Sequence, residues 1–251
     1  GTSVILTTES LPAMSHLTYL DISGNQLPSL SGMNGKFPKL ESLVAADCVI
    51  ADVSALVSFA SVKTMDFSRT AIVDFSFFSA LENLSTLILD GVPVSDCVSL
   101  TKIPNLTSLS LSGCGITDVA WIAGFSSLAE LDLSENSIFD LTFVVGKLNV
   151  QKLDLSDNAI AAFSLTDTWS SVEDLDLSGN GLVSFSVITG DGNCALRVLD
   201  LSQNAVNVFS LGNPSSLESL NLSGNVLEAF SLKSDSLRSL SLSGNPLSSL
   251  S

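Results

Sequence analysis

Residues 171–180 read SVEDLDLSGN, and the run D-L-D-L-S-G within them allows two interpretations. Acidic residues at alternate positions before a glycine look like the first half of a calcium-binding loop. Such a loop needs a bidentate glutamate at its twelfth position to complete the oxygen shell. Counting from Asp174, that position is Phe185, so the calcium loop is excluded. The recurrence of the stretch along the chain supplies the other interpretation.

The pattern L-x-x-L-x-L-x-x-N, in which other apolar residues can replace leucine, occurs eleven times. The copies begin at Leu17, Leu40, Val62, Leu84, Leu106, Leu128, Val150, Val172, Leu196, Leu217 and Leu237. Six successive intervals are 22 residues long, and random apolar sequence does not keep such a period. In each copy the alternating apolar residues predict a short strand with its leucines pointing inward. One coil cannot bury its apolar edge alone, so neighbouring coils must stack around a shared core.

The repeats resemble those of leucine-rich repeat proteins, and the resemblance covers essentially the whole chain. It implies an α/β solenoid, a horseshoe of about eleven coils with a parallel β-sheet on its concave face. We expect residues 17–251 to form the leucine-rich repeat domain and residues 1–16 to be a degenerate N-terminal coil or cap remnant. Because the chain stops just after a strand, we also expect the array to be truncated at its C-terminus.

The connecting segments predict two kinds of convex side. Repeats two to six carry an aspartate four residues after the asparagine position, at Asp52, Asp74, Asp96, Asp118 and Asp140. Aspartate is a good helix N-cap, so we expect short helical turns there. This half resembles the 22-residue repeats of internalin-like bacterial surface proteins. Repeats seven to ten alternate instead, as in N-A-I-A-A-F-S-L, which predicts extended segments and a stacked column of Phe163, Phe185, Phe209 and Phe230. The column has the repeat period, so we interpret it as a core spine rather than an aromatic binding site.

The asparagine that closes the motif lies where the chain turns, and its amide can bond backbone groups left unpaired there. This predicted ladder consists of Asn25, Asn136, Asn158, Asn180, Asn204, Asn225 and Asn245. Cys48, Thr70, Val92 and Cys114 replace asparagine in four repeats, so the ladder should be weakest in the first half. No C-x-x-C spacing exists, and we interpret Cys48, Cys97, Cys114 and Cys194 as buried free thiols rather than disulfide or zinc partners.

Charge and composition exclude several functions. The net charge of −16 opposes binding to nucleic acid or an anionic membrane surface and favours a partner with a basic surface. No apolar run reaches the length of a membrane span, which predicts no direct membrane insertion. His16 is the only histidine, and the nucleophile-elbow, P-loop and zincin motifs are absent, so we expect no enzyme, cofactor or metal site. The sequons at Asn83, Asn105 and Asn221 matter only if the protein is a secreted eukaryotic one.

Function in such a fold is expected on the strand face. The residue between the two inner leucines is aspartate in four adjacent coils, Asp132, Asp154, Asp176 and Asp200. With Glu130, Glu135, Asp157 and Asp174 these residues form the predicted ligand-binding surface. The alternative is that aspartate and serine are consensus filler, and calcium is a second possible ligand.

The sequence therefore predicts a non-enzymatic protein–protein recognition module, the ligand-binding ectodomain of a cell-surface or secreted protein. One alternative is a cytoplasmic scaffold or regulatory subunit, similar to the leucine-rich repeat subunits that wrap phosphatases. Another is the sensor arm of a larger receptor or enzyme. The oligomeric state stays open.

Overall fold

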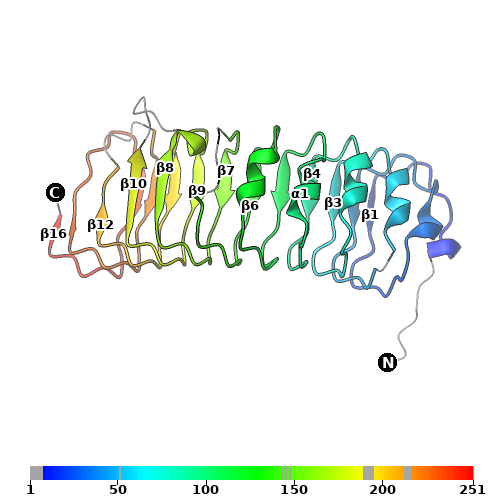
Figure 1. The fold of residues 1–251 in the computed structure, drawn as a ribbon, viewed down its shortest axis with the longest axis horizontal. Helices are drawn as coiled ribbons and strands as arrows, with labels where there is room; N and C mark the ends of the chain where they lie inside the picture. Colours follow the sequence, from blue (N-terminus) through cyan, green and yellow to red (C-terminus); the bar gives the residue numbers. More distant parts are fainter. Residues whose placement is uncertain are drawn as a thin grey trace. The chain divides into compact units, whose positions relative to one another are not determined.

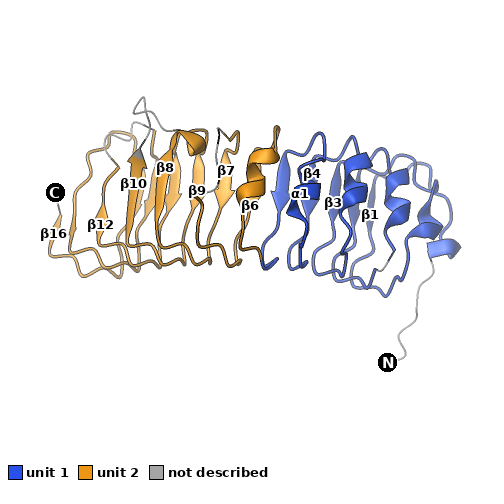
Figure 2. Cartoon of the chain, viewed as in Figure 1, with its two compact units in different colours: residues 1–115 blue, residues 116–251 orange. Residues whose placement is uncertain are grey.

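The computed structural model describes residues 8–50, 52–142, 144, 146, 148–188, 195–211 and 216–250. The chain divides into two compact units, Gly1–Gly115 and Ile116–Ser251, which Figure 2 draws in blue and orange. Within each unit the chain runs through stacked coils, each made of a strand, a turn and a returning segment (Figure 1). The predicted class, an α/β solenoid of leucine-rich coils, is thereby confirmed.

The strands occupy the predicted positions and pair in parallel with their neighbours. In the described part of the first unit they are β1 (Tyr19–Asp21), β2 (Ser42–Val44), β3 (Thr64–Asp66), β4 (Thr86–Ile88) and β5 (Ser108–Ser110). In the second unit they are β6 (Glu130–Asp132), β7 (Lys152–Asp154), β9 (Asp174–Asp176), β11 (Val198–Asp200), β13 (Ser219–Asn221) and β15 (Ser239–Ser241). Equivalent residues lie opposite one another, so the sequence columns become rows of side chains on one face.

Short helices lie behind the strands of the first half. They are 3₁₀ helices at Thr8–Ser10, Ser31–Met33, Ser54–Ser58, Ser76–Ala80 and Ala120–Gly124, and the single-turn helix α1 at Cys97–Leu100. The expected helical turns therefore occur in repeats two to five, and repeat one has one as well. The described residues after Asp140 in repeat six form no helix. Threonine and valine at 142 and 144 disfavour one, because their branched side chains lose rotamer freedom in a helix.

The aspartates that precede these helices act differently from the N-caps we expected. Only Asp96 is an N-cap, with Oδ1 accepting a hydrogen bond from the Ser99 N–H at 3.2 Å. At Asp52 and Asp74 the same oxygen accepts from the N–H two residues on, at 3.0 and 2.9 Å. The tighter 3₁₀ turn begins at that residue, so the aspartate precedes the N-cap position and makes an Asx turn.

Extended backs replace the helices in repeats seven to ten, as predicted. β8 (Phe163–Thr166), β10 (Ser184–Ile188) and β12 (Val208–Phe209) form one parallel sheet, and β14 (Ala229–Phe230) pairs with β16 (Ser249–Leu250). A 3₁₀ helix at Asp167–Trp169 follows β8. The four phenylalanine rings stack between coils with centroids 6.1, 6.4 and 6.1 Å apart. Phe185, in the middle of this column, is only 2 % exposed.

Asparagine side chains join successive coils of the second unit. Asn180 Nδ2 donates to the carbonyl of Leu155 in the preceding coil at 2.9 Å, and its Oδ1 accepts from the Ile160 N–H at 3.0 Å. In the first unit, Cys48 donates from Sγ to the Ile22 carbonyl and Cys114 to the Leu89 carbonyl. A thiol offers a weaker donor than an amide and no comparable acceptor, so these positions make fewer bonds between coils.

The described cysteines are free thiols, of which Cys48 and Cys114 are buried and Cys97 is partly exposed. Cys194 lies outside the described residues.

Candidate protein-binding face

A local hydrogen-bond motif fixes each aspartate of the strand face. Asp154 Oδ1 accepts from the N–H of Ser156 at 2.9 Å and from its hydroxyl at 2.6 Å. The aspartate and serine of the same repeat position make this pair of bonds at Asp21, Asp66, Asp132, Asp176 and Asp200. In the D-x-S motif the aspartate therefore forms an Asx turn with the serine at the end of the strand. It also holds each carboxylate in one orientation.

Four of these carboxylates lie on adjacent strands in register. Asp132 faces Asp154, Asp154 faces Asp176, and Asp176 faces Asp200. Two charges about 5 Å apart repel by about 0.8 kcal/mol in water and by about 3 kcal/mol at an effective dielectric of about 20. Burial raises the pKa of Asp176, and the charges of Asp154 and Asp200 raise it further, against the effect of the Ser178 hydrogen bonds. The carboxylates at the centre of the row therefore repel one another.

The other four residues of the predicted ligand-binding surface lie in two different places. Glu130 and Asp174 lie on the strand face, two residues before the aspartate row, with Lys152 between them. Lys152 Nζ is 3.2 Å from Glu130 Oε1, so one cation already neutralises part of this surface.

Glu135 and Asp157 lie instead in the turns after the strands, with φ of 57° and 52°. A Cβ at Gly179, which has φ of 65° in the next turn, would lie 2.2 Å from Asp157 Oδ1. The Asp157 side chain therefore occupies the space over the next coil, and a glycine leaves room for it.

A row of ion pairs precedes the strands and was not anticipated. Arg197 lies 3.8 Å from Glu173 and 3.0 Å from Glu218, and Arg238 lies 3.5 Å from Glu218. Next to it Val198 is 40 % exposed. The sequence contained the signal for these pairs, because residues of opposite charge stand at the same repeat position in successive coils. The face therefore carries an acidic row beside a mixed row of both charge signs.

Other kinds of site find no support among the residues that the structure describes. In them, no group of three or more histidine, cysteine, aspartate or glutamate side chains is arranged to hold a metal ion. Over the same ranges, none of the helices has both the length and the apolar character needed to cross a bilayer.

Sequence comparison identifies the repeats. Family models described as leucine rich repeat match residues 170–227, residues 13–27 and 102–120, and residues 236–251. No curated protein sequence gives a significant match.

Solved structures share the fold. An internalin (inlF) from Listeria monocytogenes superposes with a TM-score of 0.65 and 19 % identity, over 98 % of this chain and 85 % of that one. The APL1 leucine-rich repeat domain gives 0.69 and 20 %, over 93 % and 70 %. A chain of the LRIM1/APL1C complex gives 0.69 and 22 %, over 90 % of this chain but 43 % of that one. The matches to the repeat models and the stacked coils identify this chain as a leucine-rich repeat protein, and the solved structures share its fold.

Proposed function

We propose that this chain is a non-enzymatic recognition module whose second unit binds a protein with a basic surface through the strand face. The observation that carries the proposal is the row of four carboxylates in register, each fixed by its serine. A preorganised row loses little side-chain entropy when a partner binds. The solved complex of LRIM1 with APL1C, which contains a chain of this fold, supports a protein as the partner class.

A cationic partner fits the electrostatics of the row. Asp154 and Asp176 use Oδ1 for serine, and in the described part of the chain their second oxygens accept no hydrogen bond. An arginine or lysine from a partner would relieve the repulsion between neighbours and gain a charge-assisted hydrogen bond. Calcium fits less well, because a straight row of single oxygens does not supply the six to eight ligands that calcium prefers.

The test removes charge and keeps the acceptor that closes each strand end. At Asp200 it also removes the bond that Oδ2 accepts from Asn221 Nδ2 at 2.8 Å. The triple variant Asp154→Asn, Asp176→Asn, Asp200→Asn keeps an acceptor oxygen at each position. Asn221 already shows this substitution, since its Oδ1 accepts from the N–H and hydroxyl of Ser223 at 3.1 and 2.8 Å. Proteins retained from the source organism by the parent chain are identified, and their affinities are measured for both chains at low and at physiological ionic strength.

We expect the triple variant to bind the retained partner at least tenfold more weakly at low ionic strength, and to lose most of the salt dependence. The matched control is Asp21→Asn with Asp66→Asn, which changes the same motif in the first unit. A retained partner that binds parent and triple variant equally at low salt would show that the acidic row only closes the strands.

We further propose that the protein acts at the cell surface or after secretion, supported by the likeness to an internalin over nearly the whole chain. The free thiols at Cys48, Cys97 and Cys114 favour the alternative, an intracellular scaffold in a reducing compartment. An antibody against this chain should label intact source cells or their medium. Labelling only after permeabilisation would favour the scaffold.

A further inference from the structure

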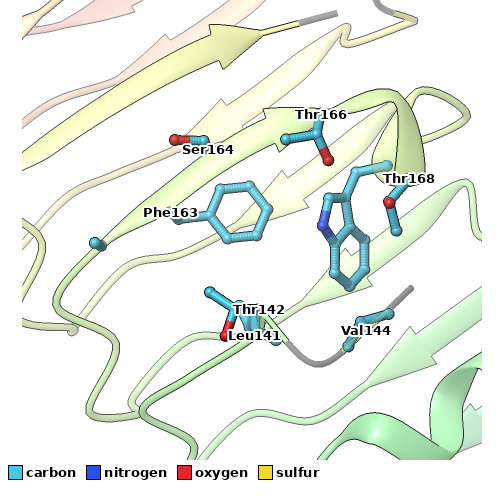
Figure 3. Close-up of a pocket in the computed structure, with 9 residues that line it drawn as sticks. Leu141, Thr142, Val144, Phe163, Ser164, Thr166 and Thr168 are labelled. Atoms are coloured by element: carbon cyan, nitrogen blue, oxygen red, sulfur yellow. The ribbon is translucent and has the colours of Figure 1, made fainter. Parts of the chain in front are cut away.

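A cavity of about 400 Å³ lies in the second unit, away from the strand face, between the connecting segments of repeats six and seven. Its lining residues are Leu141, Thr142, Val144, Ala162, Phe163, Ser164, Thr166, Thr168 and Trp169. In Figure 3 the Phe163 ring lies between Thr166, above it in the view, and Leu141 and Thr142 below it, and Thr168 and Val144 lie further to the right. The volume falls within the roughly 300–1,000 Å³ of small-molecule sites.

The lining selects for a neutral and mostly apolar occupant. Leu141, Val144, Phe163 and Trp169 are all buried and supply an apolar wall. Among the lining residues that the structure describes, the polar side chains are hydroxyls of serine and threonine, and none carries a charge. An ion would lose its hydration without gaining a counter-charge, which is costly in an apolar site.

Trp169 adds a directional requirement. Its side chain is 4 % exposed and packs against Phe163 with ring centroids 5.8 Å apart. In the described residues its indole N–H makes no hydrogen bond, whereas Trp121 donates the equivalent proton to the Asp118 carbonyl at 2.7 Å. Buried indole N–H groups normally have a partner. The cavity that Trp169 lines is where such a partner can enter.

We propose that this cavity binds a small neutral molecule with an apolar body and one acceptor oxygen, such as a ketone, which accepts a hydrogen bond from Trp169 Nε1. The apolar body fills the space beside Phe163, Leu141 and Val144. This binding is separate from protein recognition by the strand face, because no residue of the aspartate row lines the cavity.

The experiment uses cyclohexanone, acetophenone and camphor as neutral ketone probes, with camphorsulfonate as the charged counterpart of camphor. The chain contains two tryptophans, so an amide spectrum of ¹⁵N-labelled protein has two indole signals, which Trp121→Phe assigns. We expect at least one ketone to shift the Trp169 signal saturably at millimolar concentration and to leave the Trp121 signal in place. Camphorsulfonate should leave both signals unchanged.

Two variants test the place of binding without removing a core side chain. Ala162 is exposed and lines the cavity, so Ala162→Leu should fill it and abolish the shift. Ala161, also exposed, does not line the cavity, so Ala161→Leu is the matched control and should bind like the parent. Trp169→Phe lacks the indole signal, so its folding is checked by circular dichroism and its ketone affinity is compared with that of the parent by calorimetry. It should bind the ketone about fivefold more weakly, as expected for the loss of one neutral hydrogen bond.

Three results would overturn the proposal. One is a Trp169 signal that none of the ketones moves. The second is a shift that persists in Ala162→Leu, and the third is binding of camphorsulfonate as tight as that of camphor.

Discussion

Asn204→Ala removes a side chain that joins two coils of the second unit. Asn204 Oδ1 accepts from the Leu182 N–H at 3.0 Å, and Nδ2 donates to the carbonyls of Leu177 and Leu201 at 2.9 and 3.1 Å. Those three leucines are 0 % exposed, so water does not replace the lost bonds. An orphaned buried N–H costs about 1–3 kcal/mol, and a carbonyl with a second lone pair costs less. We expect the free energy of unfolding to fall by about 2–4 kcal/mol.

A second substitution at this position separates the donor role of the side chain from its acceptor role. Asn204→Cys introduces the residue found at Cys48 and Cys114, where Sγ donates to a carbonyl of the preceding coil at 3.1 and 3.2 Å. Such a thiol can keep one carbonyl satisfied but cannot serve the Leu182 N–H. The free energy of unfolding of Asn204→Cys should therefore lie between that of the parent and that of Asn204→Ala.

Urea unfolding followed by circular dichroism measures the stability change. Because stacked repeats can unfold in parts, native-state hydrogen exchange at the Leu182 amide is measured as well. This amide should exchange faster in both variants. The account of the ladder is wrong if Asn204→Ala changes the free energy of unfolding by less than about 0.5 kcal/mol and leaves exchange at Leu182 unaltered. A cysteine variant less stable than the alanine variant would contradict the graded order.

Three other predictions follow from burial. Phe185→Ala should lower the free energy of unfolding by about 3–5 kcal/mol in urea titrations, because the ring stacks between two others at 6.1 and 6.4 Å. The raised pKa of Asp176 means that the native chain binds more protons than the unfolded chain above pH 3.8, so its charge costs stability as pH rises. Asp176→Asn should therefore gain stability relative to the parent as pH rises from 3.8, as urea midpoints across pH will show. Burial raises the pKa of Cys114 to about 11, so iodoacetamide at neutral pH should alkylate the partly exposed Cys97 before Cys114, as mass spectrometry can follow.

The positions and the register of the strands could be predicted from the sequence, because the repeat period determines both. A leucine displaced by one residue would leave the core, so the motif at Leu128 or Val172 allows a single alignment. The change from helical to extended backs was also readable, since Asp118 begins one pattern and the alternation around Phe185 another. These features depend on spacing within and between repeats, and spacing is visible in a sequence.

Two kinds of feature were not predicted: the exact start of a short turn, and a space between two connecting segments. The N-cap role assigned to Asp52 failed because the 3₁₀ turn starts at a position that spacing alone does not determine. The cavity beside Trp169 forms between the connecting segments of repeats six and seven, and neither repeat pattern contains it. The Asx turn at Asp154 was different, because its D-x-S signal was present and was interpreted only as surface charge.

Repeats four and five show what the aspartate row requires. Ile88 and Ser110 stand where six of the eleven repeats have aspartate, which in sequence looks like two separate departures. Asp90 Oδ1, from the serine position of repeat four, accepts from the Ser110 hydroxyl at 2.5 Å and from the Ser112 N–H at 3.2 Å. The carboxylate that closes repeat five is thus supplied by the preceding coil. In repeat five, therefore, the acceptor stays at the strand end although the residue in the column is no longer aspartate. An aspartate on this face therefore has a structural role before any role in binding, and only a substitution that keeps the acceptor can separate the two.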